Sequence, residues 1–376
     1  MNIFSFFSGA GFLDLGFELS GHYNIVYVNE YHKAFNDVYR YSRKLMGINE
    51  PIYGHHIEDV TQFTIKENVD KLNALKKLVE ESKAEHITGM IGGPPCPDFS
   101  VGGKNRGKDG DNGKLSGTYT ELICQTQPDF FLFENVKGLY RTIRHRAFFE
   151  ELKVKFKNNG YYLTEQLVNA IEFGAPQDRD RIILIGFHRT LIEKKHINVN
   201  EETKSIVDFT WDIYKKYSRE EAFGIQWPTT NTFSEDQKYP QPKGIIPELT
   251  IQYWWNMNDV EHHPNANMFF HPRAGLARFT TIDEGDDKKK SYKRLHRWRY
   301  SPTAAYGNNE VHLHPYKARR ISVAEALAIQ SLPKEFVLPS NITLTDAFKT
   351  IGNGVPFLLA LGIAKTIYKF LSNGEN

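Results

Sequence analysis

Cysteine is scarce in this chain: Cys96 and Cys124 are the only two among 376 residues. Two cysteines are too few for a disulfide framework or for a zinc site built from several thiolates, so we expect a protein of a reducing compartment. Hydrophobic residues make up 40% of the chain and charged residues 24%, which is the balance of a globular protein. A chain of this length can bury a core that needs no disulfide or structural metal.

Long apolar runs and a basic leader are also missing. No stretch approaches about 18 uninterrupted apolar residues, so no membrane span is expected. The opening MNIFSFFSGAGFLDLGFE lacks the basic start and long apolar run of a signal peptide. We therefore expect a cytoplasmic protein with no membrane partner.

The net charge is only +2, so any surface that binds a polyanion must be local. The densest basic run is KKKSYKRLHRWR (residues 288–299), with Tyr292 and Trp298 among its cations. This arrangement is typical of a segment that contacts phosphates. The competing interpretation is a solvated charged face, because four acidic residues between positions 283 and 287 partly offset the positive charge.

The first half of the chain alternates short apolar runs with helix-like stretches. The runs at 2–7, 25–28, 87–91, 129–133 and 181–187 predict strands. This alternation favours an α/β fold with a doubly wound, mostly parallel sheet, which binds ligands at the carboxyl ends of its strands. We predict a first domain over 1–188, a smaller second domain over 189–318, and a segment 319–376 that returns to the first domain.

Polar and glycine-rich motifs follow several of these runs. Phe7-Ser8-Gly9-Ala10-Gly11-Phe12 comes after the first run, where glycines permit a tight turn and close approach of a ligand. Glu30 ends the second run, where a carboxylate can accept both hydroxyls of a ribose, and Asp59 can accept an adenine amino group. An ordinary strand–turn–helix corner and solvated acidic residues are the alternatives for each motif alone. Together they indicate a cofactor that contains adenosine.

Three further motifs carry reactive groups. Cys96 stands between Pro95 and Pro97, which limits its freedom and suits a nucleophile, although free cysteine is also often buried and structural. Glu134 in Glu134-Asn135-Val136 can hold and protonate a ring nitrogen. In the stretch QDRDR (177–181), period two predicts Gln177, Arg179 and Arg181 on one strand face, suited to an anionic or carbonyl-rich ligand. A salt-bridged glutamate and a charged edge strand are the plainer interpretations.

The order of these motifs resembles that of the DNA cytosine-5 methyltransferase family, in particular its bacterial restriction–modification members. FSGAG, VNE, PPC, ENV, QDRDR, RRISVAEALAIQSLP and IGNGVP follow one another in the family's order and rough spacing, and they cover residues 1 to about 188 and 297–376. The middle of the chain matches no recognition segment that we can identify. The resemblance implies a methyltransferase fold, with 189–318 as the target-recognition domain.

The resemblance also implies roles at matching positions. Cys96 would be the nucleophile that adds to carbon 6 of a cytosine flipped out of the duplex, while Glu134, Arg179 and Arg181 would hold its ring. The residues implied around S-adenosyl-L-methionine, which would leave as S-adenosyl-L-homocysteine, are Phe7, Ala10, Gly11, Phe12, Glu30, Tyr31, Asp59, Val60, Leu115, Asn353 and Val355. Phe12 stands where the family usually has a second glycine, so we expect its bulk to crowd the methionine part of the cofactor.

We expect DNA contacts from two basic segments. The glycine-rich loop 100–112 would close over the duplex with Ser100, Lys104 and Arg106, although a solvated loop is the plainer interpretation. The expected contacts elsewhere are Gln177, Lys293, Arg294 and Arg297. The histidines of the middle region lack a ligand spacing such as H-E-x-x-H, so no metal site is expected.

Three other functions remain as alternatives. An RNA cytosine-5 methyltransferase would share the fold, and the long insert favours duplex DNA only weakly. A non-catalytic relative would have lost Cys96, Glu134 or the arginines, and all are present. A nucleotide-dependent oxidoreductase is disfavoured because Asp14 replaces the third glycine of G-x-G-x-x-G. We expect a monomer that acts on double-stranded DNA, in a system that can include a restriction endonuclease without a stable complex.

Overall fold

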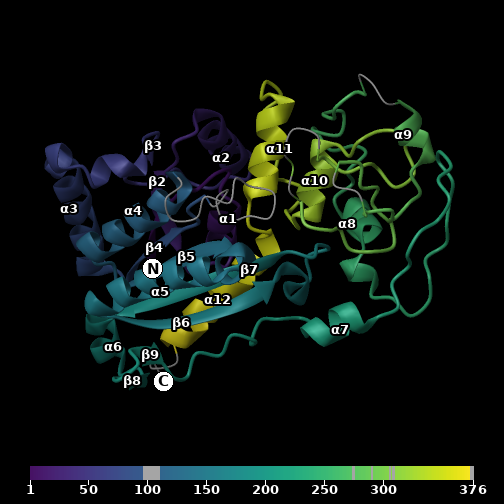
Figure 1. Cartoon of the computed structure of the whole chain (residues 1–376). Coiled ribbons are helices and arrows are strands. Elements are labelled where there is room, and N and C mark those ends of the chain that lie inside the picture. The colour runs from purple at the N-terminus through teal and green to yellow at the C-terminus, as the bar shows by residue number, and fades with distance from the viewer. Residues whose placement is uncertain (96–110, 273–275, 289–290, 305, 307–309, 373–376) are drawn as a thin grey trace.

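The computed structural model in Figure 1 shows a nine-stranded sheet with its covering helices, here called the sheet lobe. Beside it lies a second lobe, which contains the helices Ile251–Met257, Leu276–Thr281 and Val323–Ile329. The structure describes residues 1–95, 111–272, 276–288, 291–304, 306 and 310–372. Strand order across the sheet is β3-β2-β1-β4-β5-β7-β6-β9-β8. The chain leaves β1 toward β2 on one side and later returns to β4 on its other side. A ligand is therefore expected at the carboxyl end of β1, where the strand order reverses.

Strands and helices are short and alternate through the first half. The strands are β1 Asn2–Phe6, β2 Asn24–Asn29, β3 His55–His56, β4 Thr88–Gly92, β5 Phe130–Val136, β6 Tyr161–Asn169, β7 Asp180–His188, β8 Val199–Asn200 and β9 Ser205–Ile206. The α-helices are α1 Phe12–Glu18, α2 Lys33–Leu45, α3 Val69–Glu85, α4 Asp111–Thr126, α5 Ile143–Asn158, α6 Arg189–Lys195, α7 Arg219–Gly224, α8 Ile251–Met257, α9 Leu276–Thr281, α10 Val323–Ile329, α11 Leu344–Asn353 and α12 Phe357–Ser372.

The central strands are apolar on both faces because helices cover both. In β7, Ile183 and Ile185 belong to the core on the α1 and α12 side, while Ile182 and Leu184 belong to the core beneath α3, α4 and α5. This is the period of two that a strand imposes on its side chains. At Gly16 a Cβ atom would lie 2.5 Å from Ala360 Cβ, so α1 and α12 pack closely and bring the end of the chain back to its beginning.

The prediction of a doubly wound sheet is confirmed, with one difference in strand direction. β1 pairs in parallel with β2 and β4, and β4 pairs in parallel with β5. β7, however, runs antiparallel to both β5 and β6, so the sheet is mixed. β6 was absent from the predicted strands because its outer positions are polar, as in Thr164-Glu165-Gln166. The antiparallel pairing of β7 with β5 places the start of β7 beside the end of β5.

The boundary predicted at residue 188 differs from the packing of the sheet lobe. β9 pairs with β6, and Ile206 and Phe209 join the core that contains α1 and α12. The sheet lobe therefore continues past the predicted boundary.

The predicted return segment 319–376 begins in the second lobe. The helices α8, α10 and α11 share one core with Phe12 and Leu15 of α1, so this core joins the two lobes. In Figure 1, α12 (yellow) then returns to the sheet.

One part of the described chain, Leu344–Ser372, is long and apolar enough to cross a membrane when judged by length and composition alone. In the fold this part is α11 followed by α12. Its most apolar window is 61% buried inside the protein, and Leu359, Ile363 and Ile367 lie in the core against the sheet. The apolar composition of α12 is thus explained by packing.

Candidate active site

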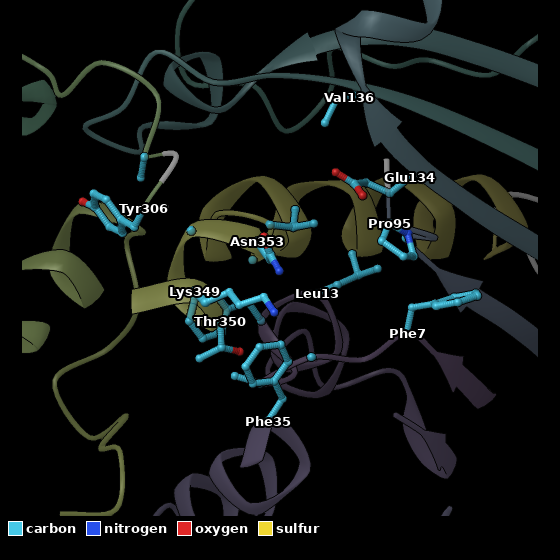
Figure 2. Close-up of a pocket in the computed structure, with 18 of the residues that line it drawn as sticks. Phe7, Leu13, Phe35, Pro95, Glu134, Val136, Tyr306, Lys349, Thr350 and Asn353 are labelled. Atoms are coloured by element: carbon cyan, nitrogen blue, oxygen red, sulfur yellow. The ribbon is translucent and has the colours of Figure 1, made fainter. Parts of the chain in front are cut away.

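A large cavity of about 1510 Å³ opens at the carboxyl ends of β1, β2, β4 and β5 and extends to the second lobe. Figure 2 shows Glu134 and Pro95 on one side of it, Lys349, Thr350 and Phe35 on another, and Tyr306 contributed by the second lobe. Most of the motifs singled out in the sequence lie along this cavity.

The loop after β1 forms the floor of the cavity next to α1. Phe7, Gly9 and Gly11 have positive φ angles of 53°, 56° and 76°, so the chain turns sharply between β1 and α1. Gly11 is the N-cap of α1, and its N–H donates to the Ser8 carbonyl at 2.7 Å. Ser8, Gly9 and Ala10 border the cavity, so this tight turn lets the backbone come close to a ligand.

Arg43 of α2 stabilises this loop through hydrogen bonds to its backbone. Its guanidinium is 4% exposed and donates to the carbonyls of Ala10 at 3.2 Å and Gly11 at 2.6 Å. It also pairs with Glu18 at 3.0 Å and stacks on the Tyr39 ring at 3.7 Å. A Cβ atom at Gly11 would lie 2.4 Å from that ring, so this position requires glycine for space as well as for its φ angle. Gly11 does not border the cavity, unlike its neighbours Ala10 and Phe12.

Glu30 stands at the end of β2 and faces the same loop. Its carboxylate accepts the N–H of Gly9 at 2.8 Å and the N–H of His32 at 2.7 Å. Burial raises the pKa of Glu30, and the two backbone donors oppose this shift. Each oxygen accepts one backbone N–H, which leaves it a lone pair for a ligand hydroxyl. Asp59 also borders the cavity, where its Oδ1 caps a short 3₁₀ turn by accepting from Thr61.

The remaining positions expected around a cofactor lie along the cavity wall. Residues from that set that border it are Phe7, Ala10, Phe12, Glu30, Tyr31, Asp59, Val60, Leu115, Asn353 and Val355. Asn353 and Val355 come from the junction of α11 and α12, so both ends of the chain meet at this site.

The expected crowding by Phe12 does not follow from its position. Although Phe12 borders the cavity, its ring is only 2% exposed and packs edge-on against Phe336 at 5.2 Å. Gly354 makes room for it, since a Cβ atom there would lie 2.1 Å from the ring. The bulk of Phe12 is therefore accommodated in the core between the lobes.

Glu134 and Arg181 form a buried ion pair on the opposite side of the cavity. The antiparallel pairing of β5 and β7 sets Val136 opposite Arg181, which brings Arg181 Nε to 2.6 Å from Glu134 Oε1. Burial raises the pKa of Glu134, and the charges of Arg181 and Arg179 oppose this shift. The other oxygen of Glu134 faces Gly93, where a Cβ atom would lie 2.5 Å away. A buried carboxyl with a raised pKa can hold or give a proton, as an acid catalyst must.

Arg179 also borders the cavity but is bound mainly to the backbone. Its Nη atoms donate to the carbonyls of Ala304 at 2.8 Å and Gly352 at 2.6 Å, and its Nε has no partner. Burial, and then the charge of Arg181, lower the pKa of Arg179. Arg179 thus joins the sheet lobe to the second lobe and to α11 where they meet at the cavity.

The predicted common strand face for the QDRDR stretch is wrong, because β7 begins only at Asp180. Gln177 is fully buried, does not border the cavity, and donates to the carbonyl of Ile329 and to the side chain of Gln330. The prediction that Gln177 contacts DNA is therefore wrong, since its amide joins the segment before β7 to the end of α10.

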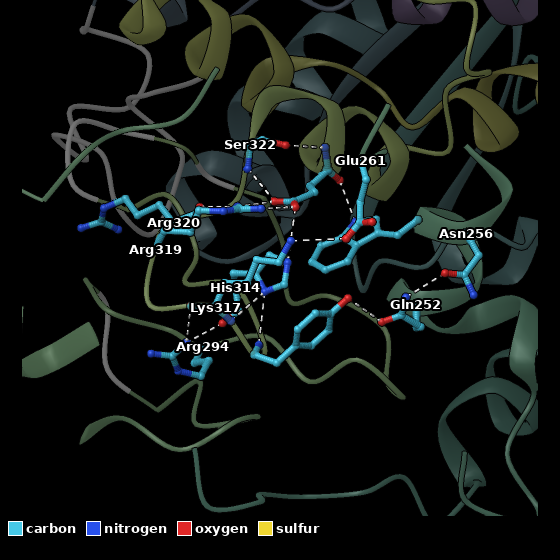
Figure 3. Close-up of polar contacts among 12 residues, drawn as sticks. Gln252, Asn256, Glu261, Arg294, His314, Lys317, Arg319, Arg320 and Ser322 are labelled. Carbon is cyan, nitrogen blue, oxygen red and sulfur yellow. Dashed lines mark hydrogen bonds and ion pairs between the residues drawn. The ribbon is translucent and has the colours of Figure 1, made fainter. Parts of the chain in front are cut away.

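The predicted DNA contacts of Arg294 and Arg297 are also wrong. Arg294 is fully buried and donates to the backbone carbonyls of residues 279, 282, 314 and 317. Figure 3 shows it below the network in which His314 and Arg319 meet Glu325. Arg297 is 5% exposed and paired with Glu284 at 2.8 Å. Lys293 alone of these three borders the cavity.

Four predicted site residues lie outside the described residues: Cys96, Ser100, Lys104 and Arg106. The residues just before the first of them, Gly93, Pro94 and Pro95, border the cavity near Glu134.

The cavity also has lining residues that were not predicted. Lys349 and Thr350 precede Asn353 on α11 by four and three positions, so helical spacing from the IGNGVP motif could have identified them. The Thr350 and Ser8 hydroxyls are buried without a hydrogen-bond partner, and both residues border the cavity. Tyr306 and Arg43 carry no comparable sequence signal. No group of three or more His, Cys, Asp or Glu residues suited to a metal ion occurs in the described part of the chain.

Comparison with known proteins gives consistent matches over nearly the whole chain. The family model for C-5 cytosine-specific DNA methylases matches residues 1–369. The chain is 57% identical over 371 residues to the Type II methyltransferase M.NmeDI of Neisseria meningitidis serogroup C, covering 99% of this chain and 84% of that protein. It is 30% identical over 385 residues to the Type II methyltransferase M.NgoPII of Neisseria gonorrhoeae, with coverages of 99% and 96%.

Solved structures share the fold at low identity. A chain named as a DNA modification methyltransferase encoded within a prophage (E. coli) superposes with a TM-score of 0.64 at 22% identity, covering 99% of this chain and all of that one. The S. pombe Dnmt2 methyltransferase superposes with a TM-score of 0.56 at 13% identity, covering 98% of each chain. At these identities the two structures show that the fold is shared.

Proposed function

This chain belongs to the C-5 cytosine-specific DNA methylase family, and on that premise we propose that it methylates carbon 5 of a flipped-out cytosine in duplex DNA through a covalent Cys96 adduct. Membership makes it a DNA cytosine-5 methyltransferase. The main support for the covalent mechanism is the buried Glu134–Arg181 pair. It lies next to Gly93–Pro95 and faces the glycine loop across the cavity.

The cavity fits S-adenosyl-L-methionine as the methyl donor. Glu30 and Asp59 offer carboxylate oxygens to ribose hydroxyls and an adenine amino group, while the unpartnered hydroxyls of Ser8 and Thr350 can meet polar groups of the methionine part. Phe7, Tyr31, Val60, Leu115, Asn353 and Val355 would complete the walls. When bound, S-adenosyl-L-methionine supplies an electrophilic methyl group to cytosine carbon 5.

The protein's part in the reaction is to make carbon 5 nucleophilic. The Cys96 thiolate forms a bond to carbon 6, and the electron pair of the 5,6 double bond moves toward carbon 5. Glu134 hydrogen-bonds ring nitrogen 3 and the exocyclic amine and supplies the proton that keeps the adduct neutral. After methylation, a base removes the carbon 5 proton, the double bond re-forms, the thiolate leaves carbon 6, and the proton on ring nitrogen 3 returns to Glu134.

Arg181 would act on the cytosine ring directly, and Arg179 would support the site indirectly. Arg181 positions the Glu134 carboxyl and presents positive charge to the cytosine carbonyl, whereas Arg179 keeps the second lobe in place by its bonds to Ala304 and Gly352. A flipped base is required because carbon 6 cannot be reached inside a stacked duplex. Both walls of the cavity come from one chain, so the proposal needs only a monomer.

The cellular role proposed follows from the relatives. Two of them are named as Type II methyltransferases, so we propose that this chain is the modification enzyme of a bacterial restriction–modification system and acts in the cytoplasm. A cognate restriction endonuclease would recognise the same DNA sequence without forming a stable complex with this chain.

The test combines turnover with trapping of the adduct. The wild-type protein should transfer radioactive methyl groups from S-adenosyl-L-methionine to duplex DNA. A duplex with 5-fluorocytosine at the target should form a covalent complex, because fluorine blocks loss of the carbon 5 substituent. Cys96→Ala should abolish both signals, and Glu134→Gln should lower turnover by about 10²–10⁴-fold. Methylation of RNA but not DNA, or unchanged turnover in Cys96→Ala, would contradict the proposal.

A further inference from the structure

An exposed basic segment borders the cavity on the side of Glu134. Residues 137–146, KGLYRTIRHR, contain Lys137, Arg141, Arg144 and Arg146 and no acidic residue. They form a 3₁₀ turn, Lys137–Tyr140, followed by the start of α5. Lys137 and Gly138 border the cavity, so the segment continues directly from the proposed active site to the outer surface.

The side chains of this segment point outward to an unusual degree. Ile143 is 88% exposed, the highest value among the exposed large hydrophobic residues of the described chain. Arg141, Arg144 and Arg146 are exposed as well. An isolated exposed aliphatic residue is common, but here it stands among cations in the segment that follows the cavity residues Lys137 and Gly138.

The backbone beneath these side chains is well anchored. Gly138 and Leu139 are buried, and the His145 ring bonds to the Gly138 carbonyl at 3.1 Å. Arg146 Nε donates to the Tyr140 carbonyl at 2.6 Å, and Lys137 pairs with Asp180 at 2.9 Å. The segment therefore presents a defined surface, and Arg141 and Ile143 contribute little to holding it.

The charges in this position oppose the local helix. Arg144 and Arg146 lie in the first turn of α5, which contains no acidic residue. Cations near a helix N-terminus are unfavourable, because the helix dipole is positive there. An exposed isoleucine adds no stability either. The free protein therefore gains no stability from these cations or from Ile143. A polyanion bound on this surface would give the cations a favourable electrostatic interaction.

We propose that residues 137–146 are a docking surface for the phosphates of duplex DNA next to the flipped cytosine. The inference rests on the proposed function, since it takes the cavity as the site of the flipped base. Duplex DNA fits because it carries closely spaced negative charge and an apolar sugar edge, matching the cations and Ile143. Its place along the cavity edge would let the duplex reach both the cavity and this surface.

The test is the salt dependence of DNA binding by charge-matched variants. Arg141→Gln/Arg144→Gln removes two positive charges from the surface, whereas Lys157→Gln/Arg189→Gln removes two near the opposite end of α5. Binding of a fluorescent duplex that contains the target would be measured by anisotropy at several salt concentrations. The first variant should reduce the slope of log Kd against log salt by about 2, because each lost phosphate contact reduces it by about 1. The control should retain the wild-type slope.

Ile143→Ser supplies a second readout. Loss of an apolar contact releases no counterions, so its Kd should rise by a few-fold with an unchanged salt slope. Stabilisation by S-adenosyl-L-methionine, read as a rise in Tm, should persist in all three variants and show that the sheet lobe is intact.

The outcomes separate this inference from the proposed function. A wild-type slope in Arg141→Gln/Arg144→Gln, with normal methylation by the wild-type protein, would overturn the docking surface and leave the proposed function standing. An equal loss in the control would also overturn it, because net charge alone would then explain the effect. Absence of DNA methylation by the wild-type protein would instead contradict the proposed function.

Discussion

Residues 288–299 and residues 137–146 are both basic in the sequence, but their arginines differ in exposure in the structure. The first is denser, yet Arg294 and Arg297 are buried and bonded within the second lobe. The second is sparser, yet its arginines are exposed, in the segment that follows the cavity residues Lys137 and Gly138. The acidic neighbours explain the difference, because Glu284 and Asp287 lie just before the first run and pair with Arg297 and Arg299. A basic run preceded by acids thus tends to pair internally.

The largest expected difference between the two regions is in stability. Arg294→Ala should lower the free energy of unfolding by about 3–5 kcal/mol, because it removes a buried cation and leaves buried carbonyls without donors. Arg141→Ala should change it by no more than about 0.5 kcal/mol, as expected for an exposed side chain. Chemical denaturation of both variants measures this. Equal losses would show that the two regions do not differ as described.

The next largest effect on stability is expected at the buried ion pair between Arg297 and Glu284 in the first region. Arg297→Met should destabilise the protein by about 3 kcal/mol, since Glu284 would remain buried and unpaired. Arg297→Met/Glu284→Met should recover much of that loss, because neither charge is then left alone. If the double variant is less stable than the single one by the full cost of a second substitution, the two side chains are not coupled.

Arg43 tests whether a buried arginine can serve the site as well as the fold. Arg43→Met removes the bonds to the Ala10 and Gly11 carbonyls, whereas Glu18→Gln disrupts the same ion pair and keeps them. Arg43→Met should weaken S-adenosyl-L-methionine binding by about tenfold, the effect of losing about 1.4 kcal/mol of loop positioning, with a smaller change in kcat. Glu18→Gln should stay within about threefold of wild type. Calorimetric titration of both variants at a temperature where they are folded checks this, and equal losses would contradict loop positioning.

The smallest effect, on DNA binding, is expected at Lys293. Of the three DNA contacts predicted in the first region, Lys293 is the one that borders the cavity. Lys293→Gln should raise the Kd for duplex DNA about threefold and reduce the salt slope by about 1. The exposed Lys288 does not border the cavity, so Lys288→Gln is the matched control. Identical slopes for the two variants would remove Lys293 from the contact surface.

Much of the site follows from the sequence because ligand-facing residues end strands. Phe7, Glu30 and Glu134 were predicted from motifs that follow strands far apart in the chain, and all border one cavity. Asn353 also borders it, but it lies at the end of α11 and was predicted from the family resemblance. In a doubly wound sheet the carboxyl ends of neighbouring strands meet at one edge, so placing a motif after a strand is enough to place it at the site.

Long-range pairing is what the sequence does not reveal. Gln177 bonds to Gln330, 153 positions away, and no local pattern indicates this partner. Likewise, the apolar run that forms β7 does not show that it lies antiparallel to β5, although this pairing brings Arg181 to Glu134. Phe12 was judged by local bulk alone, whereas Gly354 and Phe336 accommodate its ring.

The most direct test of the account is a base-resolution map of 5-methylcytosine in a plasmid that expresses this protein in a methylation-free bacterial host, beside a Cys96→Ala control. The account predicts methylation of one cytosine in one short sequence motif with the wild-type protein and none with the control. Methylation that persists in Cys96→Ala, or an unmethylated plasmid despite folded wild-type protein that binds S-adenosyl-L-methionine, would contradict it.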